Sequence, residues 1–540
     1  MAGMLTPRLA RRLALAGSAC VLAALVPRAA LADTTQVFDG DVPTGGPDHF
    51  FIPFDVPAGT QEIEILHDDL SEANILDWGL NDAAGYRGWG GGTSENTVVG
   101  VSAASRAYVP GPMTPGKWSV VVGKAKIIAS PAKYHVVITF RDAPTLAAQT
   151  ERAPYVPVAA LSNIKRYYAC DFHVHSKEST DAQPTLEEIA VFAESRGLDA
   201  VEISDHNTIT QLDYLSAVQA KHPKLLLIPG IEFTTYAGHA NAIGATKWVD
   251  HKIGQPGVTI EGAAQAIADQ GALFSMNHPA LDIGDLCIGC AWKHNLAPEK
   301  IHAIEIETGG FSQSGFLFTQ PSIDIWEKLL ATGRHIPAIG GSDDHKGGAG
   351  GALASSIGNP TTMVFADELS VAGILDGIKN GRTVVKLQAN DDPMVKLTSE
   401  VAPIGDTVKA KSTFLRAAIT GKQEDTVVRF MKNGALFEEK PVTSDPFLFE
   451  IPVTPPDAGE DHWRAEVLVL DKRRVVTSHL FIAKDPNGPD PVATRASETE
   501  GCAVTGQRGQ RGPEASTPFV ATVLACFIGL AGAARRRRRS

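Results

Sequence analysis

Cysteine is scarce in this 540-residue chain, which contains six. Cys20 and Cys526 lie in the end segments, so four remain for the body of the protein. Cys287 and Cys290 form its single Cys-x-x-Cys pair, and without a second such pair a four-cysteine zinc site is excluded. The pair is compatible with a redox couple, half of a zinc site or a local disulfide.

Two common catalytic motifs are also absent. The chain has no Gly-x-Ser-x-Gly elbow, which argues against a serine nucleophile of that type. Its glycine-rich stretch at residues 347–351 lacks the Lys-Ser/Thr ending of a P-loop. We interpret this stretch as the rim of a site rather than a phosphate cradle.

Positive charge is in short supply. Lysine and arginine number 49 against 61 acidic residues, so the formal net charge is −12. The end segments 1–32 and 503–540 together hold eleven arginines and one glutamate, so the chain between them carries −22. An acidic surface repels nucleic-acid backbones, and no nucleic-acid partner is expected.

The first 32 residues have the three parts of a secretory signal peptide. Arg8, Arg11 and Arg12 form a basic region, residues 13–26 are apolar, and Ala30-Leu31-Ala32 is a small-residue cleavage site. An uncleaved membrane anchor is the alternative. Since exported proteins meet oxidising conditions, we predict that Cys287 and Cys290 form a disulfide. It would lie near the mouth of the site that is predicted from the strand ends below.

The C-terminus carries a second predicted targeting signal. Gly501-Cys502 is followed by a polar spacer, and residues 517–540 combine a hydrophobic segment with Arg535–Arg539. This tail resembles the myxobacterial C-terminal sorting signals, which implies processing near Cys502 and a surface or secreted product. The apolar segment is short for a spanning helix, and a plain tail anchor is the alternative. We therefore expect an exported protein that contacts the membrane or cell surface through its tail before processing.

Short β-branched and aromatic runs separated by turn residues flank the middle of the chain. They predict a small β-sandwich over residues 33–145 and an immunoglobulin-like β domain over residues 391–485, with Trp463 in its core. Asn433-Gly434 predicts a hairpin turn. Residues 146–166 are a predicted linker, and residues 486–516 a flexible tether.

Residues 167–390 alternate strand and helix patterns, which indicates an α/β fold with parallel strands. Seven strands favour a barrel. The predicted strands are residues 168–174, 200–204, 225–231, 240–244, 272–276, 303–306 and 336–340. The predicted helices are residues 186–195, 212–221, 262–270, 323–331 and 371–379.

Polar residues mark the ends of these strands, where barrel enzymes carry their reactive groups. Clustered buried polar groups are costly unless they bind something, so the pattern predicts a metal site. Other histidines, such as His222 and His335, fall where helices close and are predicted to lie off the site. The strand-end residues are His173, His175, Asp205, His206, Glu232, His239, Asn277, His278, Asp343 and His345.

The order His-x-His, Asp-His, Gly-x-Glu, Asn-His-Pro and Ser-Asp-x-His resembles the PHP family, the polymerase and histidinol phosphatase domains. With its flanking β domains and export signals, the chain is most similar to the secreted carbaryl-hydrolase-like branch. The resemblance implies a distorted (β/α)7 barrel, here flanked by two small all-β sandwich domains.

The same resemblance implies two or three divalent metal ions, for which the donors suit Zn, Mn or Fe. His173, His175, Glu232 and Asp343 would hold the first ion. Glu232 would bridge to a second ion completed by His239 and His278. His206, His345 and Asp181 would hold a third, although Ala182 stands where relatives often have glycine.

Several further roles are predicted around this site. Asp205 would orient a ligand histidine. Lys177 and Arg382 could bind an anionic substrate, and ordinary solvated charges are the alternative. Glu232, Asp343 and His278 would carry catalysis. The expected activity is metal-assisted hydrolysis of a small phosphoester, with carbamate or carboxylic ester hydrolysis as one alternative. A non-catalytic surface or adhesion protein is the other.

Overall fold

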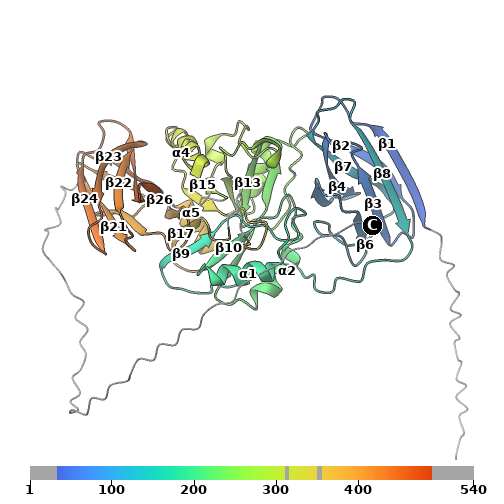
Figure 1. The fold of residues 1–540 in the computed structure, drawn as a ribbon, viewed down its shortest axis with the longest axis horizontal. Helices are drawn as coiled ribbons and strands as arrows, with labels where there is room; N and C mark the ends of the chain where they lie inside the picture. Colours follow the sequence, from blue (N-terminus) through green and yellow to red (C-terminus); the bar gives the residue numbers. More distant parts are fainter. Residues whose placement is uncertain (1–32, 310–315, 350–355, 489–540) are drawn as a thin grey trace, which may run out of the picture. The chain divides into compact units, whose positions relative to one another are not determined.

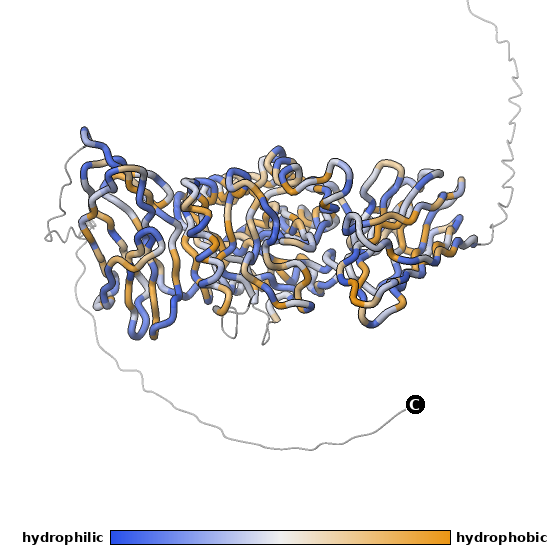
Figure 2. The backbone as a smooth tube through the Cα atoms, turned by 90° about the horizontal axis from the view of Figure 1, so that it is seen from above, coloured by the Kyte–Doolittle hydropathy of each residue, from blue (hydrophilic) through white to orange (hydrophobic). Residues whose placement is uncertain are grey.

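The computed structural model describes residues 33–309, 316–349 and 356–488, all within one compact unit. The predicted signal peptide, most of the tether and the C-terminal tail lie outside the described residues. Among the described residues, no helix is long and apolar enough to cross a membrane. Figure 2 shows apolar and polar stretches alternating along the described chain.

The N-terminal region is all-β (Figure 1). Its eight strands form two antiparallel four-stranded sheets, in the orders β1-β8-β3-β6 and β2-β7-β4-β5. In β2 buried and exposed residues alternate, as expected for a strand with one face on a core. Both sheets contribute to that core, which includes Phe54, Ile63, Trp118 and Val120. The strands are β1 Thr34–Asp41, β2 His49–Val56, β3 Glu62–Asp68, β4 Ile75–Asp82, β5 Gly85–Gly91, β6 Thr97–Gly100, β7 Gly116–Lys126 and β8 Lys133–Arg141.

The central region is a mixed α/β structure, as predicted. Parallel strands β9, β10 and β11 are joined by helices α1 and α2. A second sheet has the order β12-β13-β14-β15-β16 and is parallel only from β14 onward. The bounds in these two groups are β9 Arg166–Asp171, α1 Leu186–Ser195, β10 Ala200–Ile203, α2 Leu212–Gln219, β11 Leu226–Pro229, β12 Glu232–Thr235, β13 Gly238–Ile243, α3 Ile260–Ala268, β14 Leu273–Met276, η1 Gly284–Leu286, η2 Pro298–Lys300, β15 Ala303–Thr308, α4 Phe316–Leu330 and β16 Ala338–Gly341.

Helix starts follow local capping chemistry. Thr185 accepts a hydrogen bond from Glu188 N while the Glu188 side chain bonds back, forming a capping box for α1. The Thr259 side chain accepts a hydrogen bond from Gly262 N and so caps α3. This helix begins at Ile260, two residues before its predicted start. Ser370 caps α5, Val371–Lys379.

All seven predicted strands are present, but they are not hydrogen-bonded into one continuous sheet. Within the described residues, the hydrogen-bonded strands of this region fall into two sheets rather than a single closed one. Two isolated parallel bridges, Val174 with Asp344 and His206 with Glu232, join segments of the two sheets.

Three strands of the central region were not predicted. Glu232 does not end β11 but opens β12, which turns back on β13 through Gly238 at a φ of 146°. β17, Thr361–Ala366, and β18, Thr383–Lys386, pair antiparallel beside β9.

The C-terminal region is a second all-β unit, and its ladder continues from the central region. β18 pairs with β26, so one sheet runs across residue 390, where the boundary between the two domains was predicted. Trp463 is buried in the core as predicted, and Asn433-Gly434 turns β22 into β23 with φ values of 48° and 82°. The strands are β19 Met394–Ser399, β20 Thr407–Ala410, β21 Thr413–Thr420, β22 Thr426–Lys432, β23 Ala435–Pro441, β24 Phe447–Val453, β25 Glu460–Val469, β26 Lys472–Thr477 and β27 Leu480–Lys484.

Candidate metal centre

Glu232 lies at the middle of the predicted ligand set. Its Oε1 is 3.3 Å from a nitrogen of each of His173, His239 and His278. Its Oε2 is 2.8 Å from His206 Nδ1 and 3.5 Å from His175 Nε2. One buried carboxylate thus faces five imidazoles that come from separate segments of the chain.

The first predicted ligand set forms a compact group. One donor atom each of His173, His175, Glu232 and Asp343 lies within 4.8 Å of the others. Asp343 Oδ1 is 3.3 Å from His173 Nε2 and 3.1 Å from His175 Nε2. Asp343 keeps 21% of its side chain exposed, whereas the other three are buried.

The second predicted set gathers at Glu232 Oε1. His239 in β13 approaches through Nδ1, and His278, after β14, approaches through Nε2. Cys290 Sγ lies 3.9 Å from His239 Nδ1, but its disulfide with Cys287 leaves no thiolate there to bind a metal.

The third predicted set lies nearer to the solvent. Asp181 Oδ2 is 3.3 Å from His206 Nε2 and 3.4 Å from His345 Nε2. The Asp181 side chain is 54% exposed, so this is the most open part of the cluster. His175 also reaches this group, with its ring stacked 4.0 Å from that of His345.

Two of the predicted ligand imidazoles are fixed through their second nitrogens. His173 Nδ1 is 3.3 Å from Glu305 Oε1, and His345 Nδ1 is 2.9 Å from the Asp343 carbonyl. The Nε2 of His173 faces Glu232 and Asp343, and the Nε2 of His345 faces Asp181. This arrangement is typical of metal-binding histidines, whose outer nitrogen sets ring orientation. His206 differs, because its Nδ1 lies 2.7 Å from Thr234 Oγ1 and 2.8 Å from Glu232 Oε2 while its Nε2 faces Asp181.

The backbone is bent where it presents the ligands. Asp343 has a φ of 55° and His278 a φ of 26°, and Asn207, next to His206, has a φ of 50°. Residues other than glycine rarely adopt such values, and they persist where the surrounding structure holds them, commonly at functional sites.

Several buried polar atoms of the cluster have no hydrogen-bond partner. Orphaned polar atoms buried in a protein are costly, and a bound cation would satisfy those that face the carboxylates. His173 Nε2 and His175 Nε2 are two such atoms, and each lies beside both Glu232 and Asp343. The donor set of imidazoles and carboxylates suits Zn, Mn or Fe. The residues of the first predicted set therefore fit a divalent metal ion.

Charge coupling shifts the pKa values across the cluster. Burial disfavours the imidazolium of His173, but the Asp343 and Glu232 carboxylates outweigh it and raise the His173 pKa well above its usual value. Burial would likewise raise the pKa of Glu232, yet the facing imidazoles hold it well below its usual value. Burial and the neighbouring His345 and His206 lower the pKa of His175 to about 3, so this ring stays neutral and able to bind a cation.

Asp205 differs from its predicted role. Its two oxygens accept hydrogen bonds from Ser176 N and Ser176 Oγ, both at 2.6 Å, and not from a ligand imidazole. Asp205 thus holds the chain just after His175. Burial raises its pKa to about 8.

Sequence reasoning missed Glu305 and undervalued Asn277. Glu305 Oε2 accepts from His278 N at 2.8 Å, while its Oε1 faces His173. Asn277 Nδ2 donates to Glu232 Oε1 at 3.0 Å. The available signal was the pair Glu305 and Glu307 inside the otherwise apolar strand β15, since charged residues are rarely fully buried without partners.

Arg382, a predicted substrate-binding residue, lies far from the predicted ligands. It directly precedes β18, which runs antiparallel to β17, and its carbonyl accepts from Phe365 N. Phe365 pairs with Tyr167 at the start of β9, whereas His173 follows the other end of that strand. At about 3.3 Å per residue, Arg382 lies about 20 Å along the strand direction from the ligands. Lys177 is exposed, and its ammonium lies 5.7 Å from the Tyr214 ring centroid.

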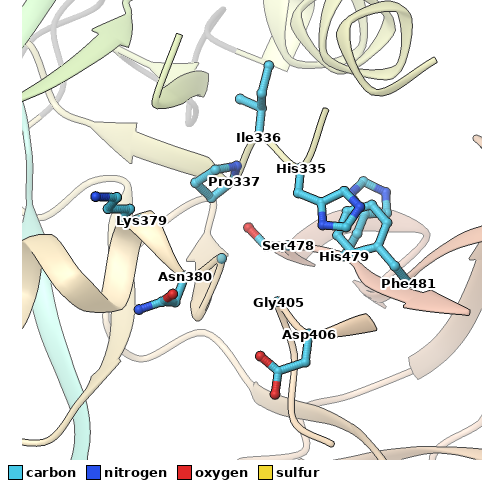
Figure 3. A pocket seen from close by; sticks show the side chains of 11 residues that line it. His335, Ile336, Pro337, Lys379, Asn380, Gly405, Asp406, Ser478, His479 and Phe481 are labelled. Atoms are coloured by element: carbon cyan, nitrogen blue, oxygen red, sulfur yellow. The ribbon is translucent and has the colours of Figure 1, made fainter. Parts of the chain in front are cut away.

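His222 and His335 lie outside these clusters. His222 pairs with Glu187 and Glu194 of α1, and His335 stacks on Phe481. Figure 3 shows His335 and Phe481 lining a cavity of about 190 Å³ beside β27, which none of the predicted ligands lines.

Another group, Glu327, His462 and His479, is also of metal-binding size. Glu327 Oε1 is already paired with Arg464 Nη1, and its Oε2 is 2.7 Å from His462 Nε2. A guanidinium beside the carboxylate disfavours a second cation, so this group is better explained as an ion-pair link between α4 and β25.

The predicted disulfide between Cys287 and Cys290 is confirmed, with Cα atoms 5.6 Å apart. We expect a non-reducing digest to yield a peptide across these residues that lacks two hydrogens, measured by mass spectrometry. Cys170, a buried free thiol, is the internal control and should react with an alkylating agent only after unfolding. Alkylation of Cys287 and Cys290 without reductant, or zinc held by their sulfurs, would contradict the assignment.

No protein-family model matches the chain, and no curated protein matches it. Among solved structures, the chain is similar to a two-domain Bacteroides vulgatus protein containing a predicted PHP-like metal-dependent phosphoesterase, at 19% identity over 62% of this chain and 100% of that one, with a TM-score of 0.33. It is also similar to a CARDB domain from Pyrococcus furiosus in complex with di-metal ions, at 18% identity over 17% of this chain and 94% of that one, with a TM-score of 0.14. Because both scores are low, the case for function rests on the buried histidine and carboxylate clusters themselves.

Proposed function

We propose that this chain is a metal-dependent hydrolase of the PHP type, acting on a small phosphoester at a two- or three-metal site. The observation that carries the proposal is Glu232, whose Oε1 faces His173, His239 and His278 and whose Oε2 faces His206 and His175. A carboxylate can hold one cation with each oxygen, so Glu232 would bridge two bound ions. The two sheets of the central region would together form the distorted barrel of that family.

Divalent ions bound there would lower the pKa of a coordinated water and polarise a phosphoryl oxygen. The chain's own residues set up this chemistry. Glu232 and Asp343 supply negative charge to offset the cations, and Glu305 and Asn277 hold His173, His278 and Glu232 in place. Asp343 is the most solvent-facing member of the first group, so we propose that it accepts the proton of the attacking water.

A substrate screen tests the reaction class. Purified protein loaded with Zn²⁺ or Mn²⁺ would be assayed on aryl phosphates, aryl carboxylic esters and aryl carbamates with the same leaving group. We expect kcat/KM to be highest for phosphates, because a paired cation site stabilises charge on phosphoryl oxygens. Preference for esters or carbamates would contradict the phosphoesterase assignment but would still support a metal-dependent hydrolase. A metal-loaded protein without turnover of any class would favour a surface or adhesion role.

We also propose that the protein is exported and is held at the cell surface or secreted. The support is the arrangement of residues 1–32 and 517–540, both outside the described residues. Detecting these end segments in protein recovered from the culture medium or cell surface would contradict processing.

A further inference from the structure

Three of the segments that carry predicted ligands touch the N-terminal β-sandwich. The loop of residues 177–182 carries Asp181, residues 206–208 carry His206, and the β12–β13 hairpin turn lies between Glu232 and His239. Each makes side-chain hydrogen bonds to the sandwich. They are Thr180 Oγ1 to the Gly90 carbonyl at 2.5 Å, Tyr86 OH to the Asn207 carbonyl at 3.2 Å and Tyr236 OH to Asp77 Oδ2 at 2.6 Å.

Arg106 of the sandwich makes the densest of these contacts. Its Nη1 donates to the Ala182 carbonyl at 2.9 Å and to the Lys177 carbonyl at 3.4 Å. Its Nη2 donates to the Thr180 carbonyl at 2.5 Å. Glu95, also in the sandwich, orients the guanidinium through Nε at 3.0 Å and Nη2 at 2.7 Å. One side chain therefore binds backbone on both sides of Asp181.

The loop it binds has no helix or strand of its own. Ser179 Oγ donates to Asp181 Oδ1 at 2.7 Å, which leaves Oδ2 facing His206 and His345. The aim of Oδ2 thus depends on the path of the backbone from 177 to 182. Backbone hydrogen bonds within the central region hold part of that path, such as Lys177 N to the Pro184 carbonyl at 2.6 Å. Arg106 adds a hold from the sandwich, through three carbonyls of the loop.

We propose that the N-terminal β-sandwich is a working part of the metal centre, and that Arg106 is the positioning residue that holds Asp181 for a third metal ion. This inference rests on the proposed function. Arginine suits the role because its planar fork presents several donors in fixed directions, whereas lysine offers a compact point charge. Arg106→Lys should therefore keep only part of the affinity for the third metal ion.

The test measures Mn²⁺ binding to the full chain by titration calorimetry and by metal content after gel filtration. Replacing a residue that orients a metal ligand commonly lowers metal affinity by about 10- to 100-fold. We expect Arg106→Ala to weaken one of three bound ions by that factor and to leave the other two unchanged. Asp181→Ala should give the same pattern, and excess Mn²⁺ should restore occupancy in Arg106→Ala but not in Asp181→Ala.

Arg141→Ala is the matched control. Arg141 is another partly buried arginine of the sandwich, at 16% side-chain exposure against 22% for Arg106, and it binds Glu62 and Glu64. Its loss should lower the melting temperature without changing Mn²⁺ stoichiometry. If Arg141→Ala weakens the third ion as much as Arg106→Ala does, the effect is general loosening of the sandwich and the proposal fails.

Thr180→Val provides a second variant should Arg106→Ala fail to fold, because it removes the hydrogen bond to Gly90 from the loop side at nearly constant volume. It should also weaken the third ion selectively. Unchanged binding in every variant that folds would overturn the inference. A wild type that binds two ions only would overturn it while leaving the proposed two-metal function intact, and a wild type that binds none would overturn both.

Discussion

Glu232→Gln should lose at least one metal ion and nearly all hydrolysis while the fold survives. The change keeps the shape of the side chain but removes the negative charge that faces five imidazoles and would offset two cations. Loss of several kcal/mol of charge stabilisation corresponds to about a thousandfold or more in rate. Metal content, kcat and circular dichroism measured on the same preparation would test the three parts of this expectation.

Two decoy histidines control for a general effect of altering the chain. His222→Ala removes ion pairs with α1 and His335→Ala removes a ring stacked on Phe481, and neither touches the ligand clusters. Both variants should stay within a few-fold of wild-type activity at full metal content. If Glu232→Gln matches them in metal content and turnover, the bridged cluster is wrong.

The strand-end pattern found residues that the fold brings together, because a metal site needs specific residue types at positions fixed by the chain direction. His173, Glu232, His278 and Asp343 are distant in sequence yet meet within a few ångströms. Their chemistry is visible in the sequence, and the convergence of strand ends supplies the geometry.

The misses have a different origin. Glu305 acts from within a strand, where a carboxylate has no motif to mark it, and its role depends on which imidazole packs beside it. Arg382 was misplaced because the sequence does not show that β18 runs antiparallel. The β12 strand was missed because it spans only four residues, Glu232–Thr235, too few for a periodic pattern.

Contacts between the sandwich and the central region were beyond sequence reasoning for the same reason. Arg106 binds three backbone carbonyls, and carbonyls carry no residue-specific signal. The sequence predicts a β domain beside an α/β domain, and the fold shows that a loop of the α/β region is held by side chains of the β-sandwich.

Metal affinity should rise steeply with pH. Burial disfavours the imidazolium of His345, but the Asp181 carboxylate outweighs it and raises the His345 pKa to about 9 in the metal-free protein. The pKa values of His173 and His206 are raised well above their usual value by Asp343, Glu232 and Asp181, again against burial. His345 therefore carries a proton at pH 7 in the metal-free protein, and the raised pKa values of His173 and His206 favour their protonated forms. A bound cation must displace such protons.

The sign follows from this competition. Below the metal-free pKa of a ligand, each displaced proton makes affinity rise about tenfold per pH unit, and the rise ends once the pH passes that pKa. Glu232 and Asp343, whose pKa values are held low by the facing imidazoles, are already ionised and add no dependence between pH 6 and 9. Titration calorimetry with chelator-buffered Zn²⁺, in buffers of different ionisation enthalpy, would count the protons released. We expect at least one proton per protein at pH 7 and fewer at pH 9, with His345→Asn releasing fewer than the wild type at pH 7. Affinity that stays flat from pH 6 to 9, with no proton release, would show that these imidazoles do not bind the cation.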